Sequence, residues 1–284
     1  AGTLCECDPC AAELVNKGVL PLLVSLMKEL SDDVPHLLVN GAISLACIAG
    51  MRQFSAQLVA TGCIEALAKF IQENSEGEMD DEQKFIIEAL KTMTEVAKDV
   101  DFRIHVGEKS LASIIKVCRR KIKDPDILDA AFTAISIISF EKSNVARIVK
   151  LGGINVIMMA IAKNSREEDL MVRAIKTIDH IANGDPSYSL LVVKCGGKTM
   201  ITKIQVRCFF KPTCTLHSFI AAAYQVLHSF CFPFLTNTAG RLQVVSRHSI
   251  RLAKRSHGHG SGREARHPRY FDFIHWFEEE GAKE

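Results

Sequence analysis

Apolar residues in the first two thirds of the chain recur every three or four positions, the spacing of one face of an α-helix rather than the alternation of a strand. Short apolar segments lie at residues 19–30, 64–72, 111–120 and 154–162, and polar breaks follow them at 31–33, 74–81, 124–126 and 164–167. Longer amphipathic segments come next, at 42–49, 89–97, 131–138 and 174–182. Because the breaks are rich in residues that cap helices or form turns, the pattern predicts an all-α fold, with a further short helix leading out of each long one.

Glycines recur with the same period. Gly18, Gly62, Gly107, Gly153 and Gly197 follow one another at intervals of 44, 45, 46 and 44 residues. Such even spacing indicates an internal repeat of roughly 45 residues with three helices in each unit. We expect each glycine to lie at a sharp corner between two helices, because glycine alone enters positive φ without steric strain.

Over residues 12–204 these features resemble the armadillo repeat family, whose repeats have this length. The corner motif apolar-x-x-Gly-Gly-Ile and the motif Ala-x-x-x-Ile/Leu-x-x-Ile in the longest helix carry the resemblance. HEAT repeats are the nearest alternative, and the corner glycine and the additional short helix favour armadillo. The resemblance implies a right-handed α-solenoid of about four and a half repeats, a piece of a longer array, with residues 1–11 as a ragged N-terminus and 205–284 as a tail of low order.

The resemblance also implies a binding surface. In the family the longest helix of each repeat lines a concave groove, and members that bind extended peptides place a Trp and, four residues later, an Asn on it. The Trp positions correspond here to Ile43, Lys91, Thr133 and Lys176, and the Asn positions to Cys47, Glu95, Ile137 and His180. We expect these residues to contact a folded protein, a helix or a segment with acidic residues, because the amide ladder is missing and two lysines would repel a basic peptide.

These observations predict a non-enzymatic scaffold or adaptor for protein–protein interaction. A nuclear transport-type cargo adaptor is the alternative within the binding class, disfavoured by the missing asparagines. An enzyme with an unrecognised site in a helical solenoid is the alternative from another class. No Walker loop, dinucleotide fingerprint, His-Glu-x-x-His or Gly-x-Ser-x-Gly motif occurs, so we expect neither catalytic residues nor a cofactor. The sequence leaves the partner's identity and the oligomeric state open.

Charge and cysteine content bear on nucleic-acid binding and on the cellular location. The formal net charge of the 284 residues is only +2, which gives no electrostatic basis for specific nucleic-acid binding. Cys47, Cys63 and Cys118 fall in apolar stretches, as free thiols do in a reducing compartment, and no signal peptide opens the chain. We therefore expect a cytoplasmic or nuclear location.

Two short clusters have alternative interpretations. The spacing Cys5-x-Cys7-x-x-Cys10 suits a thiolate metal site, but a fourth ligand is missing, so we predict no metal. The acidic run at residues 73–82 could recruit a basic partner, and a solvated loop between helices explains it more simply.

The repeat stops in the middle of a unit after Ile204. Residues 205–284 carry 11 Lys and Arg against 6 Asp and Glu, whereas residues 1–204 carry 24 against 27. The apolar stretch at 216–235 is interrupted by polar side chains, so we expect no membrane span, and the basic stretch at 241–269 suits only unspecific contact with nucleic acid. An exon-final CAG followed by intronic GT encodes Gln-Val, the dipeptide at 205–206, so the tail is either genuine or a translated intron from an erroneous gene model.

Overall fold

The computed structural model describes residues 8–29, 35–73 and 80–197, and the tail at 205–284 lies outside them. In this part the chain forms twelve α-helices, one short 3-10 helix and no strand, which confirms the predicted all-α fold. The first two repeats contain α2 (Asp8–Asn16), α3 (Val19–Glu29), α4 (Pro35–Gly50), η1 (Arg52–Phe54), α5 (Ser55–Ala60), α6 (Cys63–Glu73) and α7 (Asp80–Lys98). The next two contain α8 (Val100–Arg120), α9 (Pro125–Ile138), α10 (Lys142–Lys150), α11 (Gly153–Lys163) and α12 (Glu168–Ala182), and α13 (Pro186–Lys194) begins a fifth.

The first helix corrects one predicted boundary. Helix α2 begins at Asp8, so residues 8–11 belong to the first repeat and not to a ragged N-terminus. Ala11 is fully buried in the common core. The sequence 8–9, Asp-Pro, also matches Asp185-Pro186, where the Asp185 carboxylate caps α13 by accepting a hydrogen bond from the Ser187 N–H.

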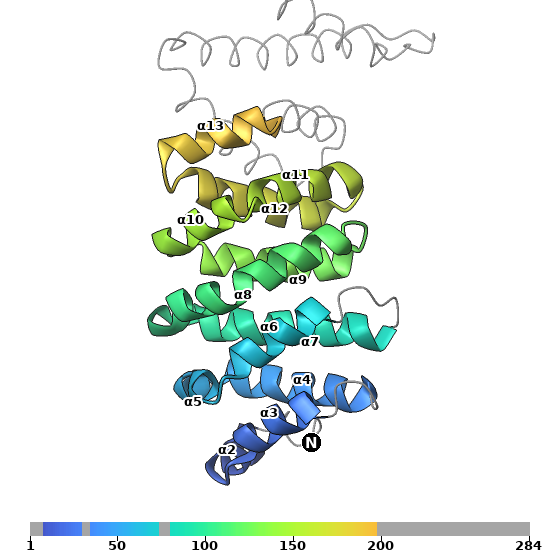
Figure 1. Ribbon diagram of the computed structural model, residues 1–284, viewed down its shortest axis with the longest axis vertical. Coiled ribbons are helices and arrows are strands. Elements are labelled where there is room, and N and C mark those ends of the chain that lie inside the picture. Colours follow the sequence, from blue (N-terminus) through green and yellow to red (C-terminus); the bar gives the residue numbers. More distant parts are fainter. Residues whose placement is uncertain (1–7, 30–34, 74–79, 198–284) are drawn as a thin grey trace, which may run out of the picture. The chain divides into compact units, whose positions relative to one another are not determined.

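The long third helices α4, α7, α9 and α12, which we call the ladder helices, pack on one another in chain order. The second helices α3, α6, α8 and α11 form a parallel row, so each repeat rests on its neighbours (Figure 1). One continuous cluster of buried side chains runs through both rows, from Ala11 to Val192. Burying one Leu or Ile stabilises the fold by about 1.5–3 kcal/mol, and stacking of neighbouring repeats contributes to this burial.

Glycine forms the predicted corners at two of the five positions. Gly18 and Gly62 have φ of 83° and 69°, and the helices on either side of Gly18 are bent by 79°. At the double glycines the prediction is wrong by one residue, because φ is positive at Gly152 and Gly196. The second glycine of each pair serves close packing instead. A Cβ on Gly153 would lie 2.6 Å from Ile148 Cγ2, and a Cβ on Gly197 would lie 2.7 Å from Val192 Cγ1.

The third repeat has no corner at Gly107, which corrects both the predicted turn and the three-helix unit there. Gly107 is buried inside α8, which runs unbroken for 21 residues. Glycine is required there for close approach, because a methyl group on Gly107 would overlap the side-chain amide of Asn144 from α10. That amide is fully buried and donates to the carbonyls of Arg103 at 3.0 Å and Ile138 at 3.2 Å. Asn144 thereby links α8 and the end of α9 to α10.

Replacing Gly107 with Ala should destabilise the protein by about 1–3 kcal/mol, because the added methyl group displaces the buried Asn144 amide. The double variant Gly107→Ala with Asn144→Ala should lose less than the sum of the two single variants. Gly50→Ala is the matched control, since a Cβ there meets nothing within 4 Å. Urea unfolding compares these four variants with the unsubstituted chain, and strictly additive losses would contradict the assigned contact.

Cys63 and Cys118 should resist alkylation in the folded protein. Both thiols are buried, and burial raises the pKa of each to about 12, so they stay protonated at pH 8. Mass spectrometry after iodoacetamide treatment should find both unmodified until denaturant is added, whereas the partly exposed Cys195 reacts earlier. Modification of Cys63 at the same rate as Cys195 would contradict this packing.

Candidate functional site

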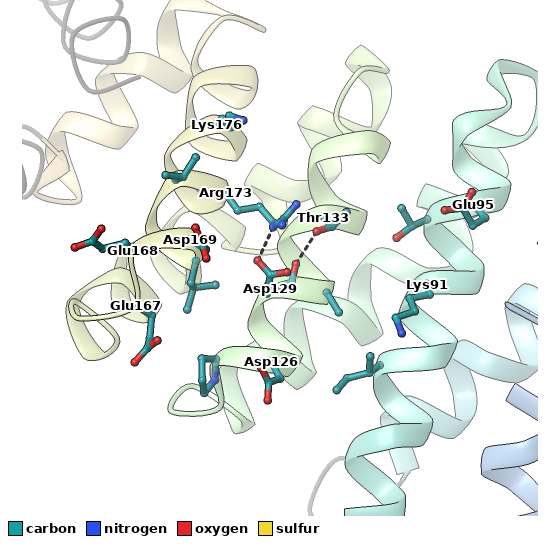
Figure 2. A pocket seen from close by; sticks show the side chains of 16 residues that line it. Lys91, Glu95, Asp126, Asp129, Thr133, Glu167, Glu168, Asp169, Arg173 and Lys176 are labelled. Atoms are coloured by element: carbon teal, nitrogen blue, oxygen red, sulfur yellow. Dashed lines mark hydrogen bonds and ion pairs between the residues drawn. The ribbon is translucent and has the colours of Figure 1, made fainter. Parts of the chain in front are cut away.

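The ladder helices α7, α9 and α12 surround a concavity of about 880 Å³ (Figure 2). It is lined by side chains between residues 87 and 95 on α7, 125 and 133 on α9, and 167 and 176 at the start of and along α12. Three consecutive repeats therefore contribute to one surface. We call the concavity that these residues line the groove.

Four of the eight predicted binding residues line the groove, namely Lys91, Glu95, Thr133 and Lys176. The other four lie outside it, on α4 or one turn further along α9 and α12. Ile43, Cys47 and Ile137 are partly buried against the core, and His180 packs beside Phe140. The structure thus brings four of the eight residues together in the groove. That all eight contact a partner stays a prediction.

The groove carries both charges with an acidic excess. Its acidic side chains are Glu95, Asp126, Asp129, Glu167, Glu168 and Asp169, and its basic ones are Lys91, Arg173 and Lys176. Most of the acids lie at the N-terminal ends of α9 and α12, and Figure 2 shows Lys176 further along α12. Carboxylates at helix N-termini also stabilise the helix dipole, so part of this acidity has a structural reason.

An ion pair joins two of the ladder helices across the groove. Arg173 Nε on α12 lies 2.5 Å from Asp129 Oδ1 on α9, and the Thr133 hydroxyl donates to the backbone carbonyl of Asp129 at 2.8 Å. Both charged side chains are about 40% exposed, so the pair contributes only about 0.2–1 kcal/mol. Its main effect is to fix where the two charges lie.

On α7 the charged groups are paired within the helix. Lys91 Nζ lies 2.6 Å from Glu88 Oε1, and Lys98 Nζ lies 2.5 Å from Glu95 Oε1. Each pair is three residues apart and faces solvent, where salt screens it. A partner can therefore compete for Lys91 and Glu95 with little loss of stability.

Sequence reasoning missed Asp129 and Arg173. They are 44 residues apart, one repeat period, and each lies about one helical turn before a residue that was predicted, Thr133 and Lys176. An opposite charge at one repeat interval was the signal that could have identified them. The side chains at 126 and 167–169 were harder to place, because only folding brings the N-terminal ends of α9 and α12 to the same concavity.

A second cluster lies beside the groove at the C-terminal ends of α9 and α12. The Phe140 and His180 rings are 4.7 Å apart between centroids, and the Arg103 guanidinium lies 5.6 Å from the Phe140 centroid. Ser136 Oγ is 3.3 Å from His180 Nδ1. Phe140 is 56% exposed, so its apolar ring is accessible beside the Arg103 guanidinium and the His180 ring.

Within the described ranges, no three His, Cys, Asp or Glu side chains are grouped as metal ligands. Cys10 belongs to α2, while Cys5 and Cys7 lie outside those ranges. The acidic run at 73–82 is described only at its two ends, where α6 ends and α7 begins. No single helix of the described part is long and apolar enough to cross a membrane, although three bent pairs of consecutive helices reach that length and composition together.

Solved structures with a similar architecture include engineered proteins. A computationally designed armadillo repeat protein for modular peptide recognition has a TM-score of 0.63 and 17% identity, covering 79% of this chain and 89% of that one. Two engineered proteins give TM-scores of 0.66 and 0.65 at 16% and 18% identity, covering 80% and 81% of this chain and 89% and 87% of their own. The chain therefore has an armadillo-type repeat fold.

Neither a protein-family model nor a curated protein matches the sequence. At identities below 20% the structural likeness concerns the fold alone. Any proposal for a partner therefore has to rest on the side chains of the groove itself.

Asp179→Asn should make the protein more stable at pH 7.5. Burial raises the pKa of Asp179, an effect that His180 and Asn183 offset only in part, so the charged carboxylate weakens folding above that pKa. As the pH falls through the raised pKa, the advantage of the variant should disappear. Urea unfolding at pH 7.5 and pH 4 measures both effects.

Asp185→Ala is the control variant for this experiment, because it should make the protein less stable at pH 7.5 where Asp179→Asn makes it more stable. Hydrogen bonds from Ser187 lower the pKa of Asp185, so its contribution is present at neutral pH and is lost as the pH falls through that lowered pKa. A less stable Asp179→Asn variant at pH 7.5 would show that the Asp179 carboxylate stabilises the native state.

Proposed function

We propose that this protein is a non-enzymatic scaffold whose groove holds a segment of a partner protein. The observation that carries the proposal is the groove itself, an open concavity along three consecutive ladder helices with oriented charges. Repeat arrays use such concave surfaces to bind partners, because each repeat contributes one rung of a continuous surface. The solved armadillo-type proteins that share this fold include one designed for peptide recognition, which supports protein binding in general terms.

The groove favours a helix or peptide that carries both charges. Basic side chains of the partner would lie near Asp126 and the acids at 167–169, and acidic ones near Lys91 and Lys176. This arrangement sets the direction of the bound segment, since the reverse orientation would place like charges together. A segment of a few helical turns fits the length of the groove, since the three helices are separated by two spacings of about 8–10 Å each.

The peptide mode of the nuclear transport adaptors has no support in these repeats. The positions that would hold asparagines carry Cys47, Glu95, Ile137 and His180, and none of these offers an amide to a peptide backbone. The paired charges of the groove suit recognition, because the Asp129 and Arg173 side chains hold each other in fixed positions. A location in the cytoplasm or nucleus stays a prediction from the cysteine pattern.

Reversing two groove charges, Lys91→Glu with Lys176→Glu, should reduce partner capture at least about tenfold, since each charge at an interface contributes about 1 kcal/mol or more. The immobilised full chain and its variant are compared by quantitative mass spectrometry of the proteins retained from native cells. Proteins lost only with the groove variant are the partners of the groove.

Lys142→Glu with Lys163→Glu is the matched control, with the same change in net charge at exposed residues outside the groove. Thermal unfolding of all three proteins shows whether they remain folded. Equal capture by the groove variant and the control would overturn the groove as the binding surface.

A further inference from the structure

Three large apolar side chains are exposed together on the first repeat. Leu22 and Leu26 lie one turn apart on α3 and are 58% and 37% exposed, and Leu37 near the start of α4 is 44% exposed. They are three of the few exposed large apolar residues in the described ranges. We call these three leucines the N-terminal face.

Repeat symmetry shows what normally happens at these positions. The buried residues of α3 recur in α6 after 44 residues, and those of α4 recur in α7 after 48. Among the second helices, the buried residues of α6 recur in α8 after 47 residues and in α11 after 90. Among the ladder helices, the buried residues of α7 recur in α9 after 42 residues and in α12 after 85. This alignment places Leu22 with Ala66, Ser113 and Val156, Leu26 with Phe70, Val117 and Ala160, and Leu37 with Phe85, Ile127 and Leu170. All nine counterparts are at most 6% exposed. The N-terminal face is therefore a surface that is buried in every later repeat.

The preceding repeat provides that burial. In the second repeat the Phe70 and Phe85 rings, 5.4 Å apart between centroids, are the counterparts of Leu26 and Leu37. The two phenylalanines are 4% exposed, because α3 packs on α6 and α4 packs on α7. No described residue covers the leucines in the same way.

We propose that the N-terminal face is a stacking surface that receives the second and third helices of a further armadillo-type repeat. The argument is continuity with the established interface, since the same positions bury the same kind of side chain in each later repeat. The occupant presents two amphipathic helices with apolar side chains at i, i+3, i+4 and i+7. This surface is separate from the groove, so the two proposals stand or fall independently.

The geometry disfavours a second copy of the chain as the occupant. At each junction between the described repeats, one surface of the earlier repeat meets a different surface of the later one. A two-fold dimer through the leucines would instead place two copies of the same surface against each other. Terminal repeats that end an array carry a polar outer face, and three exposed leucines are the opposite of such a cap.

The test adds a repeat to the chain. Residues 142–184, the fourth repeat, replace residues 1–7, so that the Asp-Pro pair at 8–9 takes the place of Asp185-Pro186 at the junction. The thermal midpoint should rise by at least about 4 °C, and amide exchange in α3 should slow, because the leucines become buried. An unchanged midpoint with unchanged exchange in α3 would overturn the proposal.

Leu22→Gln with Leu26→Gln provides the matched control, since Gln keeps helix propensity and removes the apolar surface. In the original chain these substitutions should leave the midpoint nearly unchanged, and in the extended chain they should abolish the gain. A gain that survives them would come from elsewhere and would overturn the proposal.

Sedimentation of the original chain tests whether a second copy of the chain occupies the N-terminal face. The proposal expects no association through this face at micromolar concentration. A dimer that the two Gln substitutions dissociate would show that a second copy occupies the face, and would overturn the assignment to a further repeat.

Discussion

Burial of apolar surface between neighbouring repeats is the interaction on which the rest of the described structure depends. A single unit of three short helices has a stripe that it cannot cover by itself, and the ladder helices and second helices cover it by stacking. The positions that do this recur with the repeat period from α6 to α12. At Leu22 and Leu26 in the first described repeat, the same positions stay in contact with solvent.

Polar contacts refine this stacking. Asn144 reaches back to the Arg103 carbonyl, and Thr177 Oγ1 lies 3.3 Å from the Phe132 carbonyl, so buried hydrogen bonds fix the register between neighbouring repeats. Such contacts tolerate only one spacing of the helices. Gly107 is an example. It lies inside a continuous helix, where other repeats have a corner, and its missing side chain leaves room for the Asn144 amide.

The groove is a product of this architecture. Once the ladder helices are held side by side, their outward faces form a continuous trough, and the residues on those faces are free to vary without affecting the core. Here they include the pair Asp129 and Arg173, which spans two repeats, and the lysines at 91 and 176. The buried core and the proposed binding surface thus lie on opposite sides of the same helices, which explains why a fold of this kind accommodates different partners.

The sequence by itself determined the helical content, the repeat length and the faces of the helices, because apolar spacing and glycine position are local properties of the chain. The family resemblance also pointed to Lys91, Glu95, Thr133 and Lys176, which line the groove, and their contact with a partner stays a prediction. Only the tertiary structure decided that α8 continues through Gly107, where the side chain of Asn144, 37 residues away, occupies the space. It alone decided that the acids at 126 and 167–169 share the groove and that three leucines of the first described repeat are exposed, because both depend on which helices lie side by side.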